Sequence, residues 1–321
     1  MGLVEAQDLY KRFGSLTAVD GISFKVERGE VVGFLGPNGA GKSTAMKIIS
    51  GFLEPTSGQA WIDGHNSHTD AIAARRKLGY LPEGAPAYAD MSVGAYLGFV
   101  AAMHGMSKAQ THDRLAELVE RVHLSDVWNQ RIDSLSKGFK RRVGIAQALV
   151  HDPDVLILDE PTDGLDPNQK FEMRSLIKSI APQKAIVIST HILEEVEAVC
   201  SRAIIIAKGR MLADATPAEL LARAPGAGSI LVAIATTDPQ PAIDIISKEP
   251  GVVRVVVAER INGVTRLQVQ SSAGQNSTKQ ISASQLAGVL GRANIPANEI
   301  YLQRPTLDDV FRQITSSGTE H

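Results

Sequence analysis

The chain contains the stretch Gly36-Pro37-Asn38-Gly39-Ala40-Gly41-Lys42-Ser43-Thr44, which matches the phosphate-loop pattern G-x-x-x-x-G-K-[ST]. The apolar run 31–35 before it predicts a buried parallel strand, and residues 44–50 after it predict a helix. Its three glycines let backbone N–H groups turn toward one anion, and the helix N-terminus adds partial positive charge. We expect Lys42 to reach the β- and γ-phosphates and Ser43 to complete a Mg²⁺ shell. The stretch therefore predicts a nucleoside triphosphate site, and a chance match in a glycine-rich turn is the weaker alternative.

The composition is that of a globular protein, with 44% hydrophobic and 21% charged residues in a chain of 321. This length suits one large or two ordinary domains. A formal charge of −2 argues against a nucleic-acid or membrane-surface binder that works by bulk charge. The single Cys200 excludes an internal disulfide, fits a reducing compartment and is expected to be buried and unreactive. The most apolar run, residues 91–103, is too short to cross a bilayer, so membranes would matter through a partner.

The first 222 residues predict an α/β domain with a helical insertion. Residues 92–124 have helical periodicity, and with the helix that follows they form a helical subdomain over about 86–150. Short apolar runs, or runs that alternate apolar and polar residues, predict the strands of this domain. The strand 203–206 is expected to be the last strand of the first half. The expected strands are 3–6, 22–26, 31–35, 59–62, 77–83, 155–160, 185–190 and 203–206.

Two carboxylates, Asp159 and Glu160, end the buried strand 155–160. Parallel α/β sheets place ligands at the C-terminal edge of their strands. Asp159 therefore suits a Mg²⁺-linked position, and Glu160 suits the orientation or deprotonation of an attacking water. The strand 185–190 ends at His191, at the same expected edge. A merely hydrophilic strand end is the alternative, which the upstream phosphate loop makes weaker.

Three further features have a functional and a structural interpretation. Ser136 is a candidate helix cap, and Gly138, expected to be exposed, permits a ligand to approach the backbone closely. The run 140–142, Lys-Arg-Arg, is by itself most typical of a solvated helix face. Phe13 could supply an apolar plate for a nucleotide base, although a lone phenylalanine is more often a core residue.

The second half predicts a small α+β domain. Residues 223–228 have the composition of a linker, and the domain is expected over 223–321. The order of its elements is βαββαβ, which is typical of a ferredoxin-like sandwich, and a further helix follows Pro305. No catalytic constellation occurs in its sequence. The expected elements are strands 229–236, 251–258, 264–270 and 298–303, and helices 240–248 and 282–292.

Together these motifs resemble the ATP-binding subunits of ABC transporters over about residues 3–220. Residues 36–44 resemble Walker A, and 155–160 resemble Walker B with a catalytic glutamate. Residues 136–140 resemble the signature motif, whose commoner form is Ser-Gly-Gly-Gln, and 164–166 resemble the D-loop. The resemblance implies a P-loop NTPase fold of the ABC type.

The resemblance also implies roles for individual residues, with ATP and Mg²⁺ as the bound groups. The catalytic residues would be Glu160, His191 (the switch histidine) and Lys42. Mg²⁺ would be held by Ser43, Asp159 and Glu83. The ATP site would comprise Phe13, Gly36, Pro37, Asn38, Gly39, Ala40, Gly41, Lys42, Ser43, Thr44, Glu83, Ser136, Gly138 and Asp166.

Glu83 stands where most of that family has a glutamine. With the variant signature and the closing stretch 304–311, it resembles a bacterial ABC-2-type export branch with separate membrane subunits. The implied partners are integral membrane permease subunits and a second nucleotide-binding subunit, expected to be a second copy of this chain. Two copies would face head to tail with ATP between them, at the cytoplasmic face of the inner membrane. No nucleic acid partner is expected.

Two other functions compete with export. A cytosolic ABC ATPase acting on ribosomes or DNA would carry two ATPase halves or long coiled coils, whereas this chain has one phosphate loop, no sustained heptads and no basic stripe. A regulatory module whose C-terminal domain binds a ligand is the third hypothesis, and no motif in 223–321 identifies such a ligand.

Overall fold

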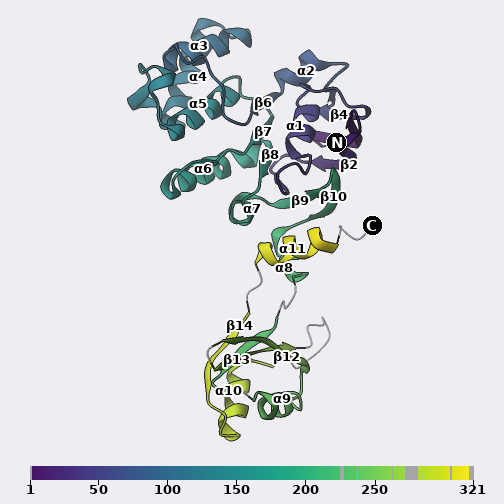
Figure 1. Ribbon diagram of the computed structural model, residues 1–321. Helices are drawn as coiled ribbons and strands as arrows, with labels where there is room; N and C mark the ends of the chain where they lie inside the picture. Colours follow the sequence, from purple (N-terminus) through teal and green to yellow (C-terminus); the bar gives the residue numbers. More distant parts are fainter. Residues whose placement is uncertain are drawn as a thin grey trace. The chain divides into compact units, whose positions relative to one another are not determined.

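The computed structural model describes residues 2–224, 228–236, 238–261, 263–271, 281–303 and 306–317. The chain divides into two compact units, Met1–Pro217 with Ile314–His321 and Ala218–Gln313 (Figure 1). The predicted domain boundary between residues 222 and 223 lies slightly after Pro217, where the first unit's main segment ends, and it remains a prediction. Residues 225–227 of the predicted linker lie outside the described residues.

The first unit is built on a six-stranded sheet of order β10-β9-β3-β8-β7-β6. Its neighbouring strands are parallel except β9 and β10. Strands β3, β7 and β8 are buried along their whole length, as expected of a parallel sheet covered on both faces. The strands are β3 (Val31–Leu35), β6 (Leu78–Leu81), β7 (Val155–Asp159), β8 (Ala185–Thr190), β9 (Arg202–Ala207) and β10 (Arg210–Ala215).

One expectation about this sheet is wrong, because β10 follows the strand predicted to be the last. Lys208 and Gly209 have φ of 50° and 79°, so the chain makes a two-residue turn with left-handed backbone at both positions. Such a turn matches the twist of two antiparallel strands and continues β9 into a hairpin.

An antiparallel sheet of order β2-β1-β4-β5 forms a second layer of this unit. Helix α1 (Lys42–Ile49) packs in the core between the two sheets, where Met46 belongs to the same buried cluster as Leu9 and Phe34. Strands β1 and β2 are longer than predicted and form a hairpin. The strands are β1 (Val4–Phe13), β2 (Leu16–Val26), β4 (Ser57–Ile62) and β5 (His65–Asn66).

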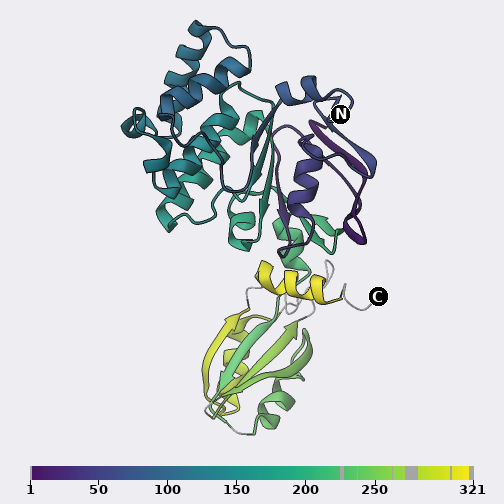
Figure 2. The ribbon, with the colours of Figure 1, turned by 45° about the horizontal axis from the view of Figure 1, so that its top comes forward.

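Helices occur over the residues of the predicted helical insertion and lie beside the parallel sheet (Figure 2). Ser92 and Ser107 cap its first two helices, the latter in a capping box with Gln110. Its helices are α3 (Val93–Met103), α4 (Lys108–Arg121) and α5 (Lys137–Leu149). The other helices of this unit are α2 (Ala71–Arg76), α6 (Pro167–Ile180) and α7 (Leu193–Val199), and α8 (Pro217–Ala222) begins at the division between the two units. Among the described residues, no helix is long and apolar enough to span a membrane.

The second unit has the predicted βαββαβ order, and its antiparallel sheet has the order β12-β13-β11-β14. The first strand therefore pairs with the third and fourth, as in the split βαβ arrangement. Both helices pack on one face of the sheet through residues such as Ile246 and Leu286. The elements are β11 (Ile230–Ile234), α9 (Gln240–Ile246), β12 (Val252–Ile261), β13 (Val264–Ser271), α10 (Ala283–Arg292) and β14 (Ala297–Leu302); α11 (Leu307–Ser317) follows.

Candidate nucleotide site

The C-terminal ends of four parallel strands meet at one edge of the central sheet. In the strand register, Leu35 of β3 pairs with Thr190 of β8, and Asp159 of β7 pairs with Ser189. Strand β6 ends beside β7, two residues before Glu83. This alignment brings the phosphate loop, Asp159, Glu160, His191 and Glu83 to the same edge, although they come from distant parts of the chain.

The glycines of the phosphate loop are required by its geometry. Gly41 has φ of 105°, and a Cβ at this position would lie 2.3 Å from the carbonyl oxygen of Ala18. A Cβ at Gly36 would lie 2.3 Å from the carbonyl oxygen of Ile206. Helix α1 begins at Lys42, so the first N–H groups of α1 have no acceptor within the helix. These donors and the helix dipole make the loop suited to phosphate.

Lys42 is buried inside the curl of this loop. Its Nζ donates to the carbonyl oxygens of Gly36, at 2.7 Å, and Pro37, at 3.1 Å. Burial lowers the pKa of the Lys42 ammonium, while the negative charges of Glu160, Asp159 and Glu83 act in the opposite direction. The three carboxylates are therefore close enough to influence Lys42, as the predicted site requires.

Asp159 is the most buried of the carboxylates, at 1% exposure. Its Oδ1 lies 3.5 Å from Ser43 Oγ and accepts a hydrogen bond from Ser189 Oγ. Among the described residues, no group of three His, Cys, Asp or Glu side chains that could hold a metal ion occurs. A carboxylate and a hydroxyl are hard oxygen ligands of the kind that Mg²⁺ prefers, usually together with substrate phosphates. The predicted pair Ser43 and Asp159 therefore fits Mg²⁺.

Glu160 and His191 form a direct contact, with 3.0 Å between Glu160 Oε1 and His191 Nδ1. The Glu160 side chain is 18% exposed and the His191 side chain 44%. Glu160 has φ of 47°, a left-handed conformation that is costly for a residue with a side chain. Its N–H donates to the carbonyl oxygen of Ser189, at 3.1 Å, which holds this conformation. The pair can orient a water molecule beside the phosphate loop.

The prediction that residues 140–142 form a solvated face is wrong for Arg141, which is only 7% exposed. Gly144, one turn later on α5, packs against Leu81, so this face of α5 is turned toward the segment that carries Glu83. Burial lowers the pKa of the Arg141 guanidinium, and nearby carboxylates, Asp163 first, oppose that effect. Its Nη1 has no hydrogen-bond partner in the described part of the chain. Glu83 itself is exposed.

The residues predicted to complete the ATP site from outside the loop occupy three other places. Ser136 caps α5 by accepting from the N–H of Phe139, at 3.3 Å, as expected. Gly138 was expected to be exposed, but it is buried because the side chain of Gln169 on α6 lies 2.7 Å from the position of a Cβ. Asp166 caps α6 by accepting from the N–H of Gln169, at 2.9 Å. Phe13 is 47% exposed at the end of β1.

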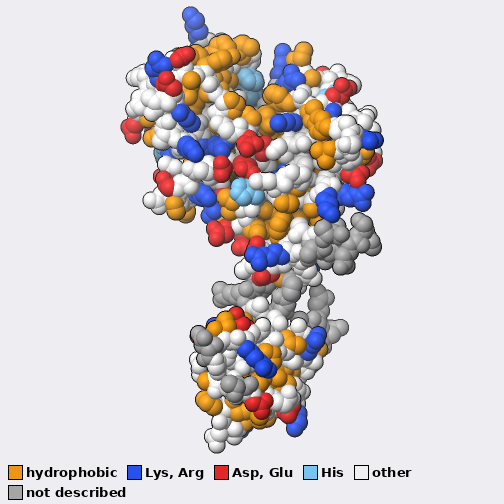
Figure 3. All heavy atoms as spheres, viewed as in Figure 1, with side chains coloured by type: hydrophobic (Ala, Val, Ile, Leu, Met, Phe, Trp, Pro, Cys, Tyr) orange, Lys and Arg blue, Asp and Glu red, His pale blue; other side chains and the backbone are white. Residues whose placement is uncertain are grey.

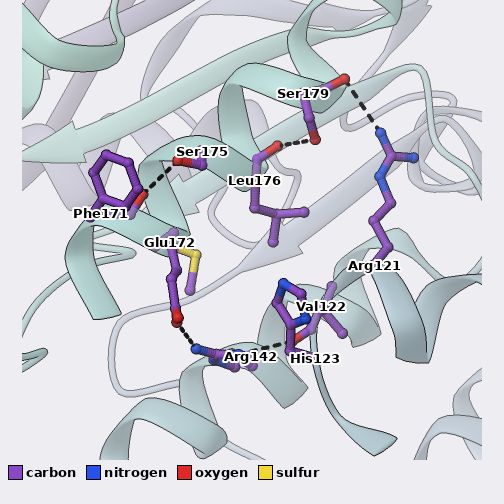
Figure 4. A pocket seen from close by; sticks show the side chains of 10 residues that line it. Arg121, Val122, His123, Arg142, Phe171, Glu172, Ser175, Leu176 and Ser179 are labelled. Carbon is purple, nitrogen blue, oxygen red and sulfur yellow. Dashed lines mark hydrogen bonds and ion pairs between the residues drawn. The ribbon is translucent and has the colours of Figure 1, made fainter. Parts of the chain in front are cut away.

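A separate pocket lies between α4, α5 and α6 (Figure 4). An ion pair between Arg142 and Glu172 crosses it, and Arg121 donates to the carbonyl oxygen of Ser179, at 3.4 Å. Its lining includes none of the residues predicted for ATP, metal or catalysis. The candidate nucleotide site is therefore the sheet edge and not this pocket.

Comparison with known proteins shows what the chain is similar to. Residues 19–163 match the family described as "ABC transporter". The "Linearmycin resistance ATP-binding protein LnrL" of Bacillus subtilis (strain 168) is 32% identical over 98% of this chain and 98% of its own length. The "Probable multidrug ABC transporter ATP-binding protein YbhF" of Escherichia coli (strain K12) is 36% identical over 69% of this chain, which spans 38% of that relative. A solved structure, "Structure of ATP binding subunit of ABC transporter", is 32% identical with a TM-score of 0.63, over 68% of this chain and 91% of that one.

Proposed function

This chain belongs to the ABC transporter family as one of its ATP-binding proteins, and on that premise we propose that it binds and hydrolyses ATP to drive export through separate membrane subunits. The contact between Glu160 and His191, at the sheet edge that also carries the phosphate loop, is the observation that carries this proposal. A phosphate-binding loop alone would support binding only. The carboxylate–histidine pair adds a group that can activate water.

Each residue at this edge has a definite task in the proposed reaction. The phosphate loop and the Lys42 ammonium bind the β- and γ-phosphates. Mg²⁺, held by Ser43 and Asp159 with Glu83 nearby, would offset the phosphate charge. The Glu160 carboxylate orients the attacking water and accepts its proton, and His191 holds that carboxylate through Nδ1.

The proposed reaction uses two copies of the chain. Ser136 and Gly138 would meet the ATP held by the phosphate loop of the other copy, head to tail, with the N-terminus of α5 directed at the γ-phosphate. In the single chain the side chain of Gln169 lies against Gly138. This flexible amide has to move before a nucleotide can reach the glycine. Phe13, exposed at the end of β1, is available to stack on the adenine.

An exposed apolar surface supports docking on membrane subunits. Apolar side chains gather over α2 and α3 (Figure 3), and Ile72 and Met103 are 73% and 72% exposed. Tyr88, at 59% exposure, packs edge-on against Phe99. An apolar surface of this kind is a common mark of a protein partner. Docking there would hold the chain at the cytoplasmic face of the inner membrane, close to the loop that carries Glu83.

The Glu160→Gln variant tests the proposal. It keeps the side-chain shape but removes the base, so we expect ATP binding within about twofold of the wild type and hydrolysis reduced at least ~10²-fold. ATP should then hold two copies together, measured as a doubled mass by light scattering with and without ATP. Near-normal turnover by this variant would show that another group activates the water.

A further inference from the structure

We propose that Glu195 is a positioning residue for the hydrolytic step, joining the segment that carries Glu160 to the segment that carries His191. Glu195 lies on α7 and is 5% exposed. Its Oε2 accepts from Thr190 Oγ1, at 2.9 Å, and its Oε1 accepts a hydrogen bond from Thr162 Oγ1. Both threonines are at least as buried as the carboxylate, with exposures of 2% and 3%. The inference rests on the proposed ATP hydrolysis.

The first end of this bridge holds the backbone around His191. Thr190 ends β8 and directly precedes the histidine. Its hydroxyl donates to Glu195 and also accepts from the N–H of Ile192, at 3.0 Å. One hydroxyl group therefore fixes the residues on both sides of His191. The N–H of Glu195 donates to the carbonyl oxygen of Ile192, at 3.2 Å, which closes this turn.

The second end holds the turn after Glu160. Thr162 lies two residues beyond the glutamate, and the N–H of Asp163 donates to the carbonyl oxygen of Glu160, at 3.2 Å. Glu160 itself has a left-handed backbone, which needs support from its surroundings. A bond from Thr162 to the buried carboxylate of Glu195 provides that support from the protein interior.

The two segments are thus connected twice, once at the surface and once in the interior. The surface contact, Glu160 to His191, involves a half-exposed imidazole and competes with water. The bridge Thr162–Glu195–Thr190 is charge-assisted and shielded from water, so it is the stronger connection. We infer that it sets the orientation in which the surface pair forms, whereas the phosphate loop has no bond to it among the described contacts.

The experiment separates the hydrogen bond from the packing of the core. Thr162→Val keeps the shape of the side chain and removes its hydrogen-bond donor, whereas Thr162→Ser keeps the donor. Glu195→Gln removes the negative charge of the carboxylate. Glu194→Gln is the matched control, because Glu194 lies on the exposed side of α7. We expect kcat to fall at least ~10-fold in Thr162→Val and Glu195→Gln, with the Kd for ATP within about twofold of wild type. Thr162→Ser and Glu194→Gln should keep kcat within about threefold.

Two further readouts distinguish positioning from a general structural role. In a His191→Ala background, Glu195→Gln should lower the single-turnover rate no further, because the bridge acts by orienting the Glu160–His191 pair, which this background has already lost. The second readout is the NMR signal of the His191 ring in the nucleotide-free chain. A spectrum of His191→Asn identifies this signal among those of the eight histidines. In Thr162→Val the signal should shift toward the position that it has in Glu160→Gln.

The inference is overturned if kcat and ATP affinity fall in parallel, if the losses multiply in the His191→Ala background, or if the His191 signal does not move in Thr162→Val. A wild-type chain that binds ATP but does not hydrolyse it would instead refute the proposed function. The NMR comparison needs no turnover, so it tests the bridge in that case as well.

Discussion

Acid should destabilise the first unit of this protein through one histidine, His151, which follows α5. Its Nε2 lies 3.1 Å from the carbonyl oxygen of Leu78, its ring stacks on His104 at 3.7 Å, and its Nδ1 is buried without a partner in the described chain. Burial lowers the pKa of His151 to about 4, and the adjacent His104 and Lys184 act in the same direction, whereas the bond to Leu78 and the charge of Asp152 oppose it. Protonation of this ring therefore opposes the folded state.

The sign and size of the effect follow from linkage between protonation and folding. The unfolded chain binds the proton with a pKa of about 6.5 and the folded chain with one of about 4. The neutral ring therefore contributes its full stability above pH 6.5, and this contribution is lost as the pH falls from 6.5 to 4. A difference of about 2.5 units corresponds to at most ~3 kcal/mol.

Urea unfolding of the full chain between pH 7.5 and 4.5 would measure this loss. Both tryptophans, Trp61 and Trp128, lie in the first unit, so their fluorescence reports the unit that contains His151. His151→Gln should flatten the pH dependence of the unfolding free energy by ~2 kcal/mol between pH 6.5 and 4.5, and the exposed control His112→Gln should leave it unchanged. If the unfolding free energy depends on pH equally in the wild type and in His151→Gln, the reasoning is refuted.

Three further variants test the site and the domain division. Gly41→Ala should weaken ATP binding at least ~10-fold by equilibrium dialysis, because the methyl group meets the Ala18 carbonyl, whereas Gly98→Ala, which has open space around it, should bind normally. Glu83→Gln should keep most ATPase activity and shift the Mg²⁺ concentration for half-maximal rate, since a charge near the metal is replaced by a neutral amide; superimposable Mg²⁺ titrations would contradict this. A chain ending at Ala222 should still bind ATP, since no site residue is expected beyond it; a folded but non-binding product would contradict the predicted boundary.

Local sequence was sufficient where the chemistry of a motif depends on neighbouring residues. The phosphate loop needs glycines at positions that the pattern itself specifies, and Gly41 has the left-handed φ that explains the requirement. The buried strands β3, β7 and β8 were predicted because a run of apolar residues ended by turn or charged residues has few other solutions. The family inferred from these motifs is confirmed, and the match to LnrL extends through the second half of the chain.

The roles of individual side chains outside the motifs depended on packing that no sequence period contains. Arg141 belongs to a basic run typical of a solvent-facing helix, but the close packing of Gly144 against Leu81 turns it inward. Gly138 belongs to an expected ligand-facing motif, but the side chain of Gln169 covers it in the single chain. Both outcomes depend on residues more than twenty positions away in the sequence.

The sequence by itself determined the phosphate loop, the two carboxylates at the end of β7, the histidine after β8 and the order of elements in the second half, because each depends on a few adjacent residues and on strand or helix periodicity. Only the tertiary structure decided that Ser189 bonds Asp159 and that Glu195 joins Thr162 to Thr190. Parallel strands place residues thirty positions apart side by side, and their register is set by the packing of the whole sheet. Which hydroxyl meets which carboxylate is therefore a property of the folded sheet rather than of any local pattern.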